Sequence, residues 1–178
     1  MKYSHIILII NLLSLVLVSC VNQVEQKEEP ITTRNFEESL LAANRDAVKV
    51  EDQQIDDFIA RHKLEMWKSG TGLRYMIYER AKGQEAKEGK IAMIEYSVQL
   101  LNGDLIYSSE ETGNKEFIIG KGVVEAGLEE GILLLKEGDR AKFIIPSHLG
   151  FGLMGDQDKI PPKATLIYDV KLLKIKDK

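Results

Sequence analysis

The segment from residue 123 to residue 168 constrains most strongly how this chain can fold. It begins with VVEAGLEEG, continues through KEGDRAKFIIPS and ends in KIPPKATLIY. Helical spacing of apolar residues over 125–136 predicts a short helix, residues 141–145 predict a strand, and the adjacent prolines mark a loop before a final strand. Apolar side chains stand beside turns throughout, and no residue resembles a nucleophile. We therefore expect an apolar pocket beside a helix and a sheet.

Further strands are predicted on both sides of that segment. Residues 73–79 alternate as a half-buried strand and residues 91–101 form a longer one. Asn102-Gly103 predicts a hairpin turn to residues 105–107, because both residues tolerate positive φ. Residues 116–119 and 166–173 complete the pattern, and residues 108–114 are expected to be a polar loop. One helix against five to six mostly antiparallel strands is an α+β architecture.

The predicted helix over 125–136 has a defined apolar face. Its buried stripe is expected to consist of Leu128, Ile132, Leu133 and Leu135, with Gly138 ending the helix. Glu129 and Glu130 suit its first turn, where carboxylates oppose the positive end of the helix dipole.

Composition excludes several classes of partner and chemistry. The 178 residues suit one domain with appendages, and 24 basic against 28 acidic residues leave a net charge of -4. No basic run or aromatic-basic stripe is present, so we expect no nucleic-acid partner. His148 lacks a neighbouring nucleophile and is read as a loop or cap residue, and Asp156 and Asp158 lack the spacing of a calcium loop. We expect no cofactor and no metal.

The N-terminus predicts export. Lys2 precedes an apolar run over residues 6–18, which has the length of a signal-peptide core and is short for a membrane span. The run closes with Leu17-Val18-Ser19-Cys20, which resembles a bacterial lipobox. Residues 1–19 are interpreted as a lipoprotein signal peptide and Cys20, the single cysteine, as the lipidation site, where acyl chains such as palmitate anchor the chain to a membrane. The alternative is a signal anchor with an incidental cysteine.

Two segments separate this anchor from the sheet. Residues 20–34 are polar, without apolar periodicity, and are read as a lipidated tether. Residues 35–64 form a helical segment, of one long helix or two short ones, because apolar residues recur at helical spacing without glycine or proline. The helix over 35–62 serves either for self-association or client binding, or for packing on its own domain. Residues 65–178 would form the globular domain.

Several motifs together resemble the FKBP-type peptidyl-prolyl isomerases. In order, they are YxxxLxxG, SS, IGK, GLEEG, EGDRAKFIIP, GFG and KIPPKATLIYDVKLL, and the resemblance covers residues 72–175. It implies a twisted antiparallel half-barrel wrapped round one short helix, with a prolyl pocket between the helix and the sheet. With the lipobox and the helical lead-in, the chain is similar to bacterial lipoprotein members, including those associated with gliding motility in Bacteroidota.

The resemblance also implies the residues of the site. Those expected to act on the prolyl bond are Tyr96, Tyr107, Phe117, Phe151 and Tyr168. Those expected to bind the substrate are Ile106, Val124, Glu125, Leu128 and Ile160, with the backbone N–H near Glu125 donating to a substrate carbonyl. For each apolar residue the alternative is an ordinary core position.

Four of these positions depart from the family pattern. Tyr107 stands where the family usually has aspartate before the Ser-Ser pair, and Phe151 where it usually has tyrosine. Glu125 replaces an apolar residue at the pocket rim, and Leu128 is smaller than the tryptophan that many members carry. A lost hydrogen bond costs about 0.5 to 1.5 kcal/mol, so we expect weak activity and poor binding of the family's macrolide inhibitors.

Two functions follow from these observations. The first is a peptidyl-prolyl cis-trans isomerase that assists the folding of exported, proline-containing polypeptides at the cell envelope, on the periplasmic or outer-membrane face, where slow proline steps limit folding. The second is a non-catalytic binding module or chaperone subunit of an envelope machine for motility or secretion. The aromatic walls and the IPP loop favour the first, and the two missing polar groups favour the second.

Overall fold

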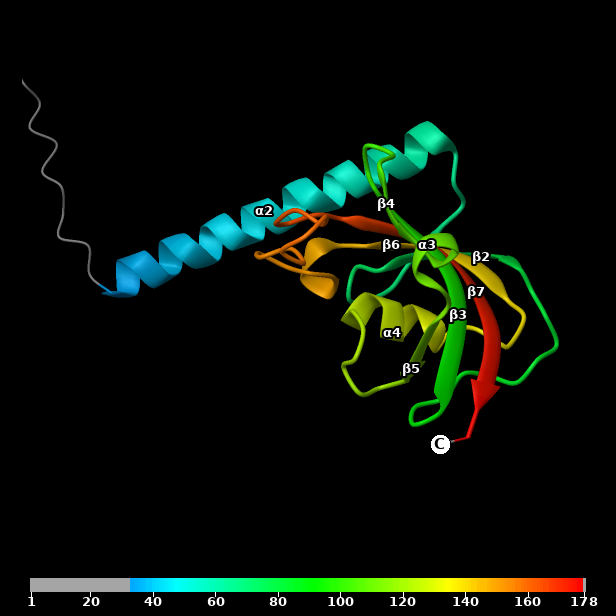
Figure 1. Ribbon diagram of the computed structural model, residues 1–178. Coiled ribbons are helices and arrows are strands. Elements are labelled where there is room, and N and C mark those ends of the chain that lie inside the picture. Colours follow the sequence, from blue (N-terminus) through cyan, green and yellow to red (C-terminus); the bar gives the residue numbers. More distant parts are fainter. Residues whose placement is uncertain (1–32, 178) are drawn as a thin grey trace, which may run out of the picture. The chain divides into compact units, whose positions relative to one another are not determined.

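The computed structural model describes residues 33–177. Helix α2 (Thr33–His62) is followed by strands β1 (Trp67–Lys68), β2 (Arg74–Glu79), β3 (Ile91–Leu100) and β4 (Leu105–Ser108), the short helix α3 (Ser109–Thr112), and β5 (Lys115–Ile118). Helix α4 (Ala126–Ile132), β6 (Arg140–Ile145), the 3-10 turn η2 (Ser147–Leu149) and β7 (Leu166–Lys176) complete the chain (Figure 1).

All strands belong to one antiparallel sheet. Its order is β1-β2-β6-β7-β3-β4, and β5 pairs with the other end of β3. The long strands β3 and β7 form the centre, with Val98 opposite Tyr168 and Tyr96 opposite Val170. The ladder between β3 and β7 shifts register between Met93 and Ile94, where Leu173 of β7 is the extra residue of a β-bulge. The predicted α+β fold is confirmed, with seven strands where five to six were expected.

Helix α4 packs closely on the inner face of the sheet (Figure 1). Two glycines one helical turn apart allow the approach, because a Cβ on Gly127 would lie 2.5 Å from Cγ2 of Ile145 and one on Gly131 would lie 2.8 Å from the ring of Phe143. Leu128 and the strand residues facing it are fully buried, and they form the main core of the protein.

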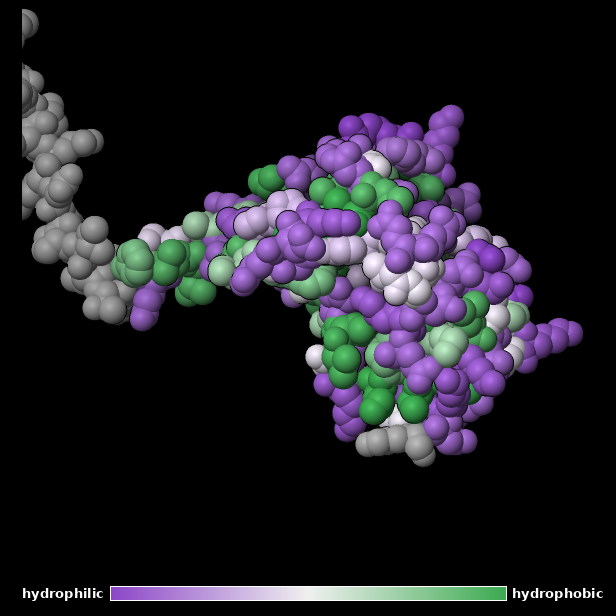
Figure 2. Space-filling view, viewed as in Figure 1, coloured by the Kyte–Doolittle hydropathy of each residue, from purple (hydrophilic) through white to green (hydrophobic). Residues whose placement is uncertain are grey.

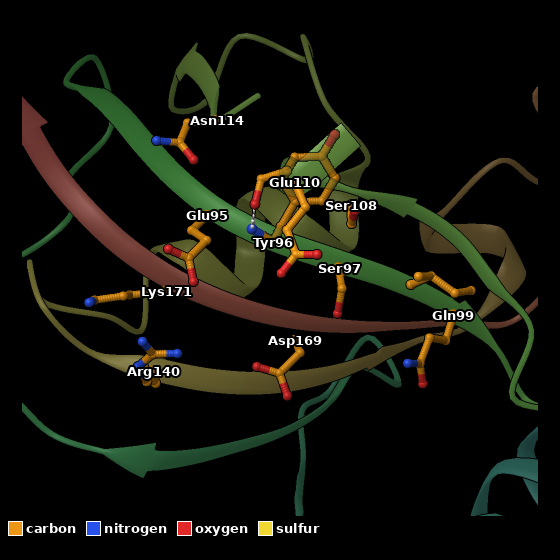
Figure 3. Close-up of a pocket in the computed structure, with 12 residues that line it drawn as sticks. Glu95, Tyr96, Ser97, Gln99, Ser108, Glu110, Asn114, Arg140, Asp169 and Lys171 are labelled. Carbon is orange, nitrogen blue, oxygen red and sulfur yellow. Dashed lines mark hydrogen bonds between the residues drawn. The ribbon is translucent and has the colours of Figure 1, made fainter. Parts of the chain in front are cut away.

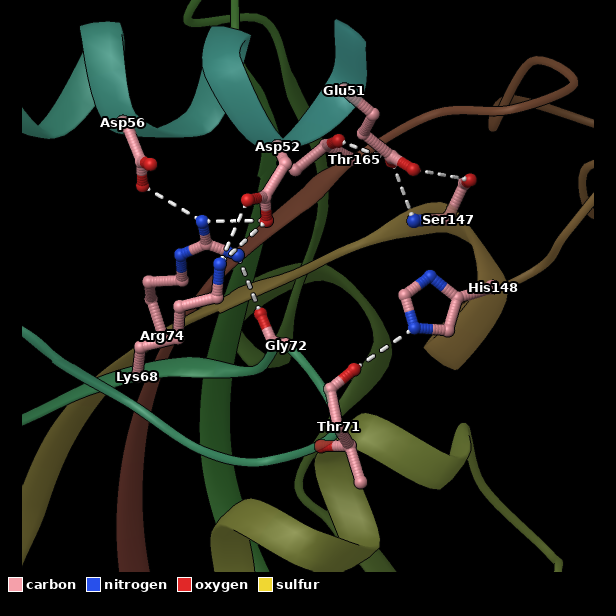
Figure 4. Close-up of polar contacts among 10 residues, drawn as sticks. All are labelled: Glu51, Asp52, Asp56, Lys68, Thr71, Gly72, Arg74, Ser147, His148 and Thr165. Carbon is pink, nitrogen blue, oxygen red and sulfur yellow. Dashed lines mark hydrogen bonds and ion pairs between the residues drawn. The ribbon is translucent and has the colours of Figure 1, made fainter. Parts of the chain in front are cut away.

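The opposite face of the sheet is covered near Ile144 and Ile167 by helix α2. Ile55 and Phe58 are buried there and form a second, smaller apolar cluster with these two residues. The side chain of Arg74 on β2, only 2% exposed, pairs through one guanidinium nitrogen with Asp52 and Asp56 of the helix, each at 2.7 Å (Figure 4). Accordingly, one compact unit begins at Leu41 and includes the rest of α2 as well as the sheet.

Several local expectations were wrong, each for a tertiary reason. Helix α4 ends at Ile132 rather than near residue 136, and Leu133 is 38% exposed instead of buried. The chain leaves the helix early because the Lys136 and Ala81 N–H groups both donate to the buried Asp139 carboxylate. Gly138, with φ of 96°, therefore serves the turn before β6. Residues 109–112, expected as loop, form the helix α3.

The N-terminal predictions concern residues that are mostly outside the described part of the chain. The signal peptide over 1–19, Cys20 and the tether up to residue 32 lie there, while residues 33 and 34 already belong to α2. Between residues 33 and 177, the chain forms no helix of the length and hydropathy needed to cross a bilayer.

Candidate functional site

The residues proposed for the site gather around helix α4, although they come from six parts of the chain. Tyr96, Phe117, Leu128, Ile160 and Tyr168 belong to the main buried core, and Ile106, Tyr107, Val124 and Phe151 pack against it while partly exposed. Glu125 precedes the first residue of α4 and contacts Tyr168. The fold thus brings the whole predicted set together, while its role in substrate binding stays a prediction.

Two tyrosines from the central strands form the inner wall. The rings of Tyr96 on β3 and Tyr168 on β7 lie 6.3 Å apart between centroids, at 28° to one another, and both residues are buried. Their neighbour Leu128 is 0% exposed and Tyr168 is 1% exposed. The Tyr96 hydroxyl is 2.9 Å from Oγ1 of Thr112 on α3. Short helix α3 therefore positions one aromatic wall, which sequence patterns had not suggested.

Glu125 places a carboxylate against this aromatic wall. The Tyr168 hydroxyl donates to Oε1 of Glu125 at 2.9 Å, while the buried Oε2 has no hydrogen-bond partner among residues 33–177. Burial, followed by the charge and the hydrogen bond of Glu125, raises the pKa of Tyr168 well above its ordinary value. The Glu125 backbone N–H likewise finds no acceptor in the described chain. It is therefore available to a ligand carbonyl.

The hydroxyl of Tyr107 points toward the loop that joins β6 to β7. That hydroxyl donates to Oδ2 of Asp156 at 2.5 Å, and it lies 3.4 Å from Oδ2 of Asp158. The hydrogen bond to Asp156 and partial burial raise the pKa of Tyr107 to about 12. The hydroxyl thus fastens β4 to the loop, so the predicted catalytic role of Tyr107 gains no support from its orientation.

The loop over residues 146–165 carries both remaining walls, Phe151 and Ile160. It is folded tightly, since Asp156 accepts hydrogen bonds from the N–H groups of Asp158 and Ile160 at 2.9 and 2.7 Å. Gly155 has a φ of 66°, and a Cβ there would lie 2.1 Å from the Ile160 carbonyl oxygen. The Asp156 carboxylate, considered from the sequence only as a calcium ligand, is therefore the centre of the loop's hydrogen bonds. In the sequence, the only signal for this turn was the spacing of Asp156 and Asp158, two aspartates separated by one residue.

A separate hollow lies on the outer face of the sheet. It has a volume of about 550 Å³ and is lined by polar side chains of β3, β6 and β7, among them Glu95, Gln99, Arg140, Asp169 and Lys171 (Figure 3). Tyr96 also borders it, and its backbone N–H donates to Oγ of Ser109 at 3.2 Å. The polar lining makes this hollow unsuited to a prolyl ring, so we keep the aromatic set around α4 as the candidate site.

Apolar side chains also lie exposed close to α4. Figure 2 shows hydrophobic residues at the surface in the region of that helix. In the chain, Val123 shortly before α4 is 66% exposed, and Leu133 and Leu134 just after it are each 38% exposed. Leu153 and Met154 of the 146–165 loop are 67% and 68% exposed.

The predicted site is mainly apolar and aromatic, and Glu125 supplies its one carboxylate. Between residues 33 and 177, no three His, Cys, Asp or Glu side chains are arranged to hold a metal ion. His148 lies outside the aromatic set, with Nε2 3.0 Å from the Thr71 carbonyl oxygen (Figure 4), which agrees with its reading as a loop residue. The chemistry open to this arrangement is that of a buried apolar and aromatic cluster, with the backbone N–H of Glu125 next to it.

Comparisons with known proteins agree with this geometry. Residues 82–173 match the family of FKBP-type peptidyl-prolyl cis-trans isomerases. A Neisseria meningitidis serogroup B protein named probable FKBP-type peptidyl-prolyl cis-trans isomerase FkpA is 39% identical over 107 residues, which are 60% of this chain and 39% of that protein. A Haemophilus influenzae protein, named probable FKBP-type peptidyl-prolyl cis-trans isomerase, is 32% identical over 162 residues, covering 86% of this chain and 66% of the relative. The crystal structure of FkpA from Escherichia coli superposes with a TM-score of 0.64 at 27% identity, covering 84% of this chain and 75% of the other.

Proposed function

Because the chain belongs to the FKBP-type peptidyl-prolyl cis-trans isomerase family, we propose that it catalyses the cis-trans isomerisation of prolyl bonds in polypeptides. Since the matched region spans only 39% of the first relative's length and 66% of the second's, activity and substrates are proposed for this chain and not transferred from those proteins. The observation that carries the proposal is the aromatic set around α4 together with the backbone N–H of Glu125. This N–H has no acceptor among the described residues.

Such a site can accelerate rotation without a nucleophile. The barrier of about 18 to 20 kcal/mol arises from the double-bond character of the amide C–N bond. An apolar surround disfavours the charge-separated resonance form of the amide, and a pocket that binds the twisted amide better than the planar one lowers the barrier further. Tyr96, Phe117 and Tyr168 would contact the prolyl ring, and the Glu125 N–H would bind a substrate carbonyl.

We expect this activity to be weak. Phe151 has no hydroxyl to offer a substrate, and the Tyr107 hydroxyl is already bonded to Asp156. Leu128 and Tyr168 are also closed to solvent, so a substrate can reach them only if the side chains around them move. Each missing hydrogen bond of about 0.5 to 1.5 kcal/mol corresponds to a several-fold to about tenfold loss of rate.

The test is an isomerisation assay on the purified chain from residue 33 onward. Acceleration of cis-trans exchange in a proline peptide, followed by NMR exchange spectroscopy, should fall on substitution Phe151→Ala and rise on Phe151→Tyr, which supplies a hydroxyl at that position. Tyr78→Phe is the matched control, because Tyr78 bonds to Asp169 on the outer face of the sheet. No acceleration by the unmodified chain at micromolar concentration would refute the proposal.

We further propose that the protein acts at the cell envelope, held by acyl chains on Cys20. The apolar run over residues 6–18, which closes with Leu17-Val18-Ser19-Cys20, supports this location. Labelling of expressing cells with an alkyne analogue of palmitate should modify the full-length chain, and Cys20→Ala should abolish the label while Ser19→Ala retains it. Equal labelling of the Cys20→Ala chain would contradict the lipid anchor.

The second candidate is a binding module or chaperone subunit of an envelope machine, in which isomerisation is vestigial. The observation that favours it is the lack of a hydroxyl at Phe151 and of the family's usual carboxylate at Tyr107, whose own hydroxyl is bonded to Asp156. Loss of cellular function on truncation of α2, with no effect of Tyr96→Ala or Phe151→Ala, would favour this alternative. The truncation must stop before Glu51, since Ile55 and Phe58 pack on the sheet.

Self-association through the 35–62 helix is a related proposal. Leu41 and Val48, two turns apart on one face of this helix, are 56% and 49% exposed. A helical apolar face open to water is a frequent site of helix pairing. Sedimentation velocity should show a dimer that Leu41→Glu with Val48→Glu dissociates, whereas a concentration-independent monomer would contradict the proposal.

A further inference from the structure

One carboxylate holds both ends of the loop that carries Phe151 and Ile160. Glu51 of helix α2 accepts the backbone N–H of Ser147 at 2.6 Å and the Ser147 hydroxyl at 2.9 Å (Figure 4). Its Oε1 also accepts the Thr165 hydroxyl at 2.6 Å. Ser147 is the second residue after β6, and Thr165 immediately precedes β7. The first and last turns of the 146–165 loop are therefore joined through a residue about one hundred positions earlier in the chain.

The bonds at Glu51 are well placed to set the shape of the loop. Charge-assisted hydrogen bonds are short and roughly twice as strong as neutral ones, and three of them converge on a single partly buried carboxylate. The Ser147 carbonyl in turn accepts the Gly152 N–H at 2.8 Å, and the Gly152 carbonyl accepts the Lys163 N–H at 2.8 Å. A continuous series of hydrogen bonds thus leads from Glu51 to the residue next to Phe151.

Helix α2 is itself fixed on the sheet at this point. Ile55 and Phe58 lie buried one and two turns beyond Glu51, and Asp52 and Asp56 pair with the buried Arg74. Glu51 consequently projects from a rigid element rather than from a mobile chain end. The opposite side of the loop is held independently by Tyr107, through Asp156.

We propose that Glu51 is a positioning residue for the candidate site. It holds the two ends of the 146–165 loop together, so that Phe151 and Ile160 face Tyr168. The N-terminal helix is then part of the isomerase site and not only a spacer. This inference rests on the proposed function for its kinetic readout, and its structural readout is independent of any activity.

Two substitutions at Glu51 separate positioning from simple loss of charge. In Glu51→Gln the amide oxygen can accept from Ser147 N–H and Thr165, and the amide NH₂ can donate to the Ser147 hydroxyl, so all three contacts survive. In Glu51→Ala none of them survives. Asp52→Ala is the matched control, because it removes ion pairs of Lys68 and Arg74 from the same turn of the helix without touching the loop.

The experiment compares these variants at a temperature where urea unfolding shows each to be folded. For Glu51→Ala we expect KM for a proline peptide to rise about tenfold with a smaller change in kcat, since displaced walls weaken substrate and transition state alike. The amide NMR resonances of Phe151, Gly152 and Ile160 should shift or broaden in Glu51→Ala. Glu51→Gln and Asp52→Ala should keep both the wild-type KM and the wild-type loop resonances.

Each alternative outcome counts against the inference. Unchanged loop resonances in Glu51→Ala would overturn it, whatever happens to KM, and so would identical effects of Glu51→Ala and Asp52→Ala. If the unmodified chain shows no isomerase activity, the proposed function fails, while the loop resonances still decide whether Glu51 positions Phe151 and Ile160.

Discussion

Substitution Gly131→Ala tests whether helix α4 is held at its observed depth on the sheet. The new Cβ would stand 2.8 and 2.9 Å from three ring carbons of Phe143, which is fully buried. Carbon atoms prefer separations of about 3.5 to 4.0 Å, so the helix or the ring must move by roughly 0.6 to 1.2 Å. Overpacking of this kind costs about 1 to 3 kcal/mol. Alanine recovers up to about 1 kcal/mol through its higher helix propensity, which leaves a net loss of about 1 kcal/mol.

The assay is urea unfolding followed by far-ultraviolet circular dichroism, because Trp67 is 73% exposed and reports poorly on folding. Gly70→Ala provides the matched control, since a Cβ added at Gly70 would meet no atom within 4 Å beyond its chain neighbours, and its φ is not positive. A glycine-to-alanine change at such a position stabilises by about 0.4 to 1 kcal/mol by restricting the unfolded chain. The free energies of unfolding of the two variants should therefore differ by about 1.5 kcal/mol, while the slope of that free energy against urea concentration should be the same.

The same substitution should also affect the site. Raising α4 from the sheet moves Leu128 away from Tyr168, so isomerase activity should fall by more than the small folded fraction lost. Equal stability of Gly131→Ala and Gly70→Ala would refute the reasoning, because it would mean that the gap between α4 and Phe143 accommodates a methyl group without cost.

Three further predictions concern the polar groups. Replacement Arg74→Met should lower the free energy of unfolding by about 2 kcal/mol, and Asp52→Asn in that background should add little, as a thermodynamic cycle from urea unfolding would reveal. Tyr107→Phe removes the hydrogen bond to Asp156 and should lower the free energy of unfolding by about 1 kcal/mol. Proteolytic cleavage of the 146–165 loop should become faster, and unchanged cleavage would contradict the role of this bond in holding the loop. The raised pKa of Tyr168 means that its stabilising contribution is complete below pH 10 and lost as pH rises above it, because the unfolded residue ionises first; unfolding at pH 9 and 11 should show this loss, reduced in Tyr168→Phe.

Local patterns predicted most strands and the hairpin, because each depends on neighbours in sequence. The alternation from Ile91 to Leu100 places every second side chain in the core, and Asn102-Gly103 forms the turn with Gly103 at a φ of 94°. Helix α4 was predicted too long, since its end is set by Asp139, a residue beyond the helix that binds backbone N–H groups from two segments.

The site was predicted through its order of motifs rather than through its chemistry. Apolar residues such as Phe117 and Leu128 look the same whether they line a pocket or fill a core, so periodicity could not distinguish the two roles. Contacts between distant residues were invisible for a different reason: Tyr107 and Asp156 are 49 positions apart, and nothing local in either segment selects the other.

The sequence alone determined the class of fold and the order of its elements, because alternation, turn residues and helical spacing act within a few residues. The residues proposed for the site followed from the resemblance to the family. Only the tertiary structure decided how those residues are held. The Tyr168 hydroxyl donates to Glu125, and the Tyr107 hydroxyl donates to Asp156. Glu51 accepts hydrogen bonds from both ends of the 146–165 loop. These bonds link segments tens of residues apart, because folding of the sheet brings their polar groups together out of water, where most buried polar groups are hydrogen-bonded.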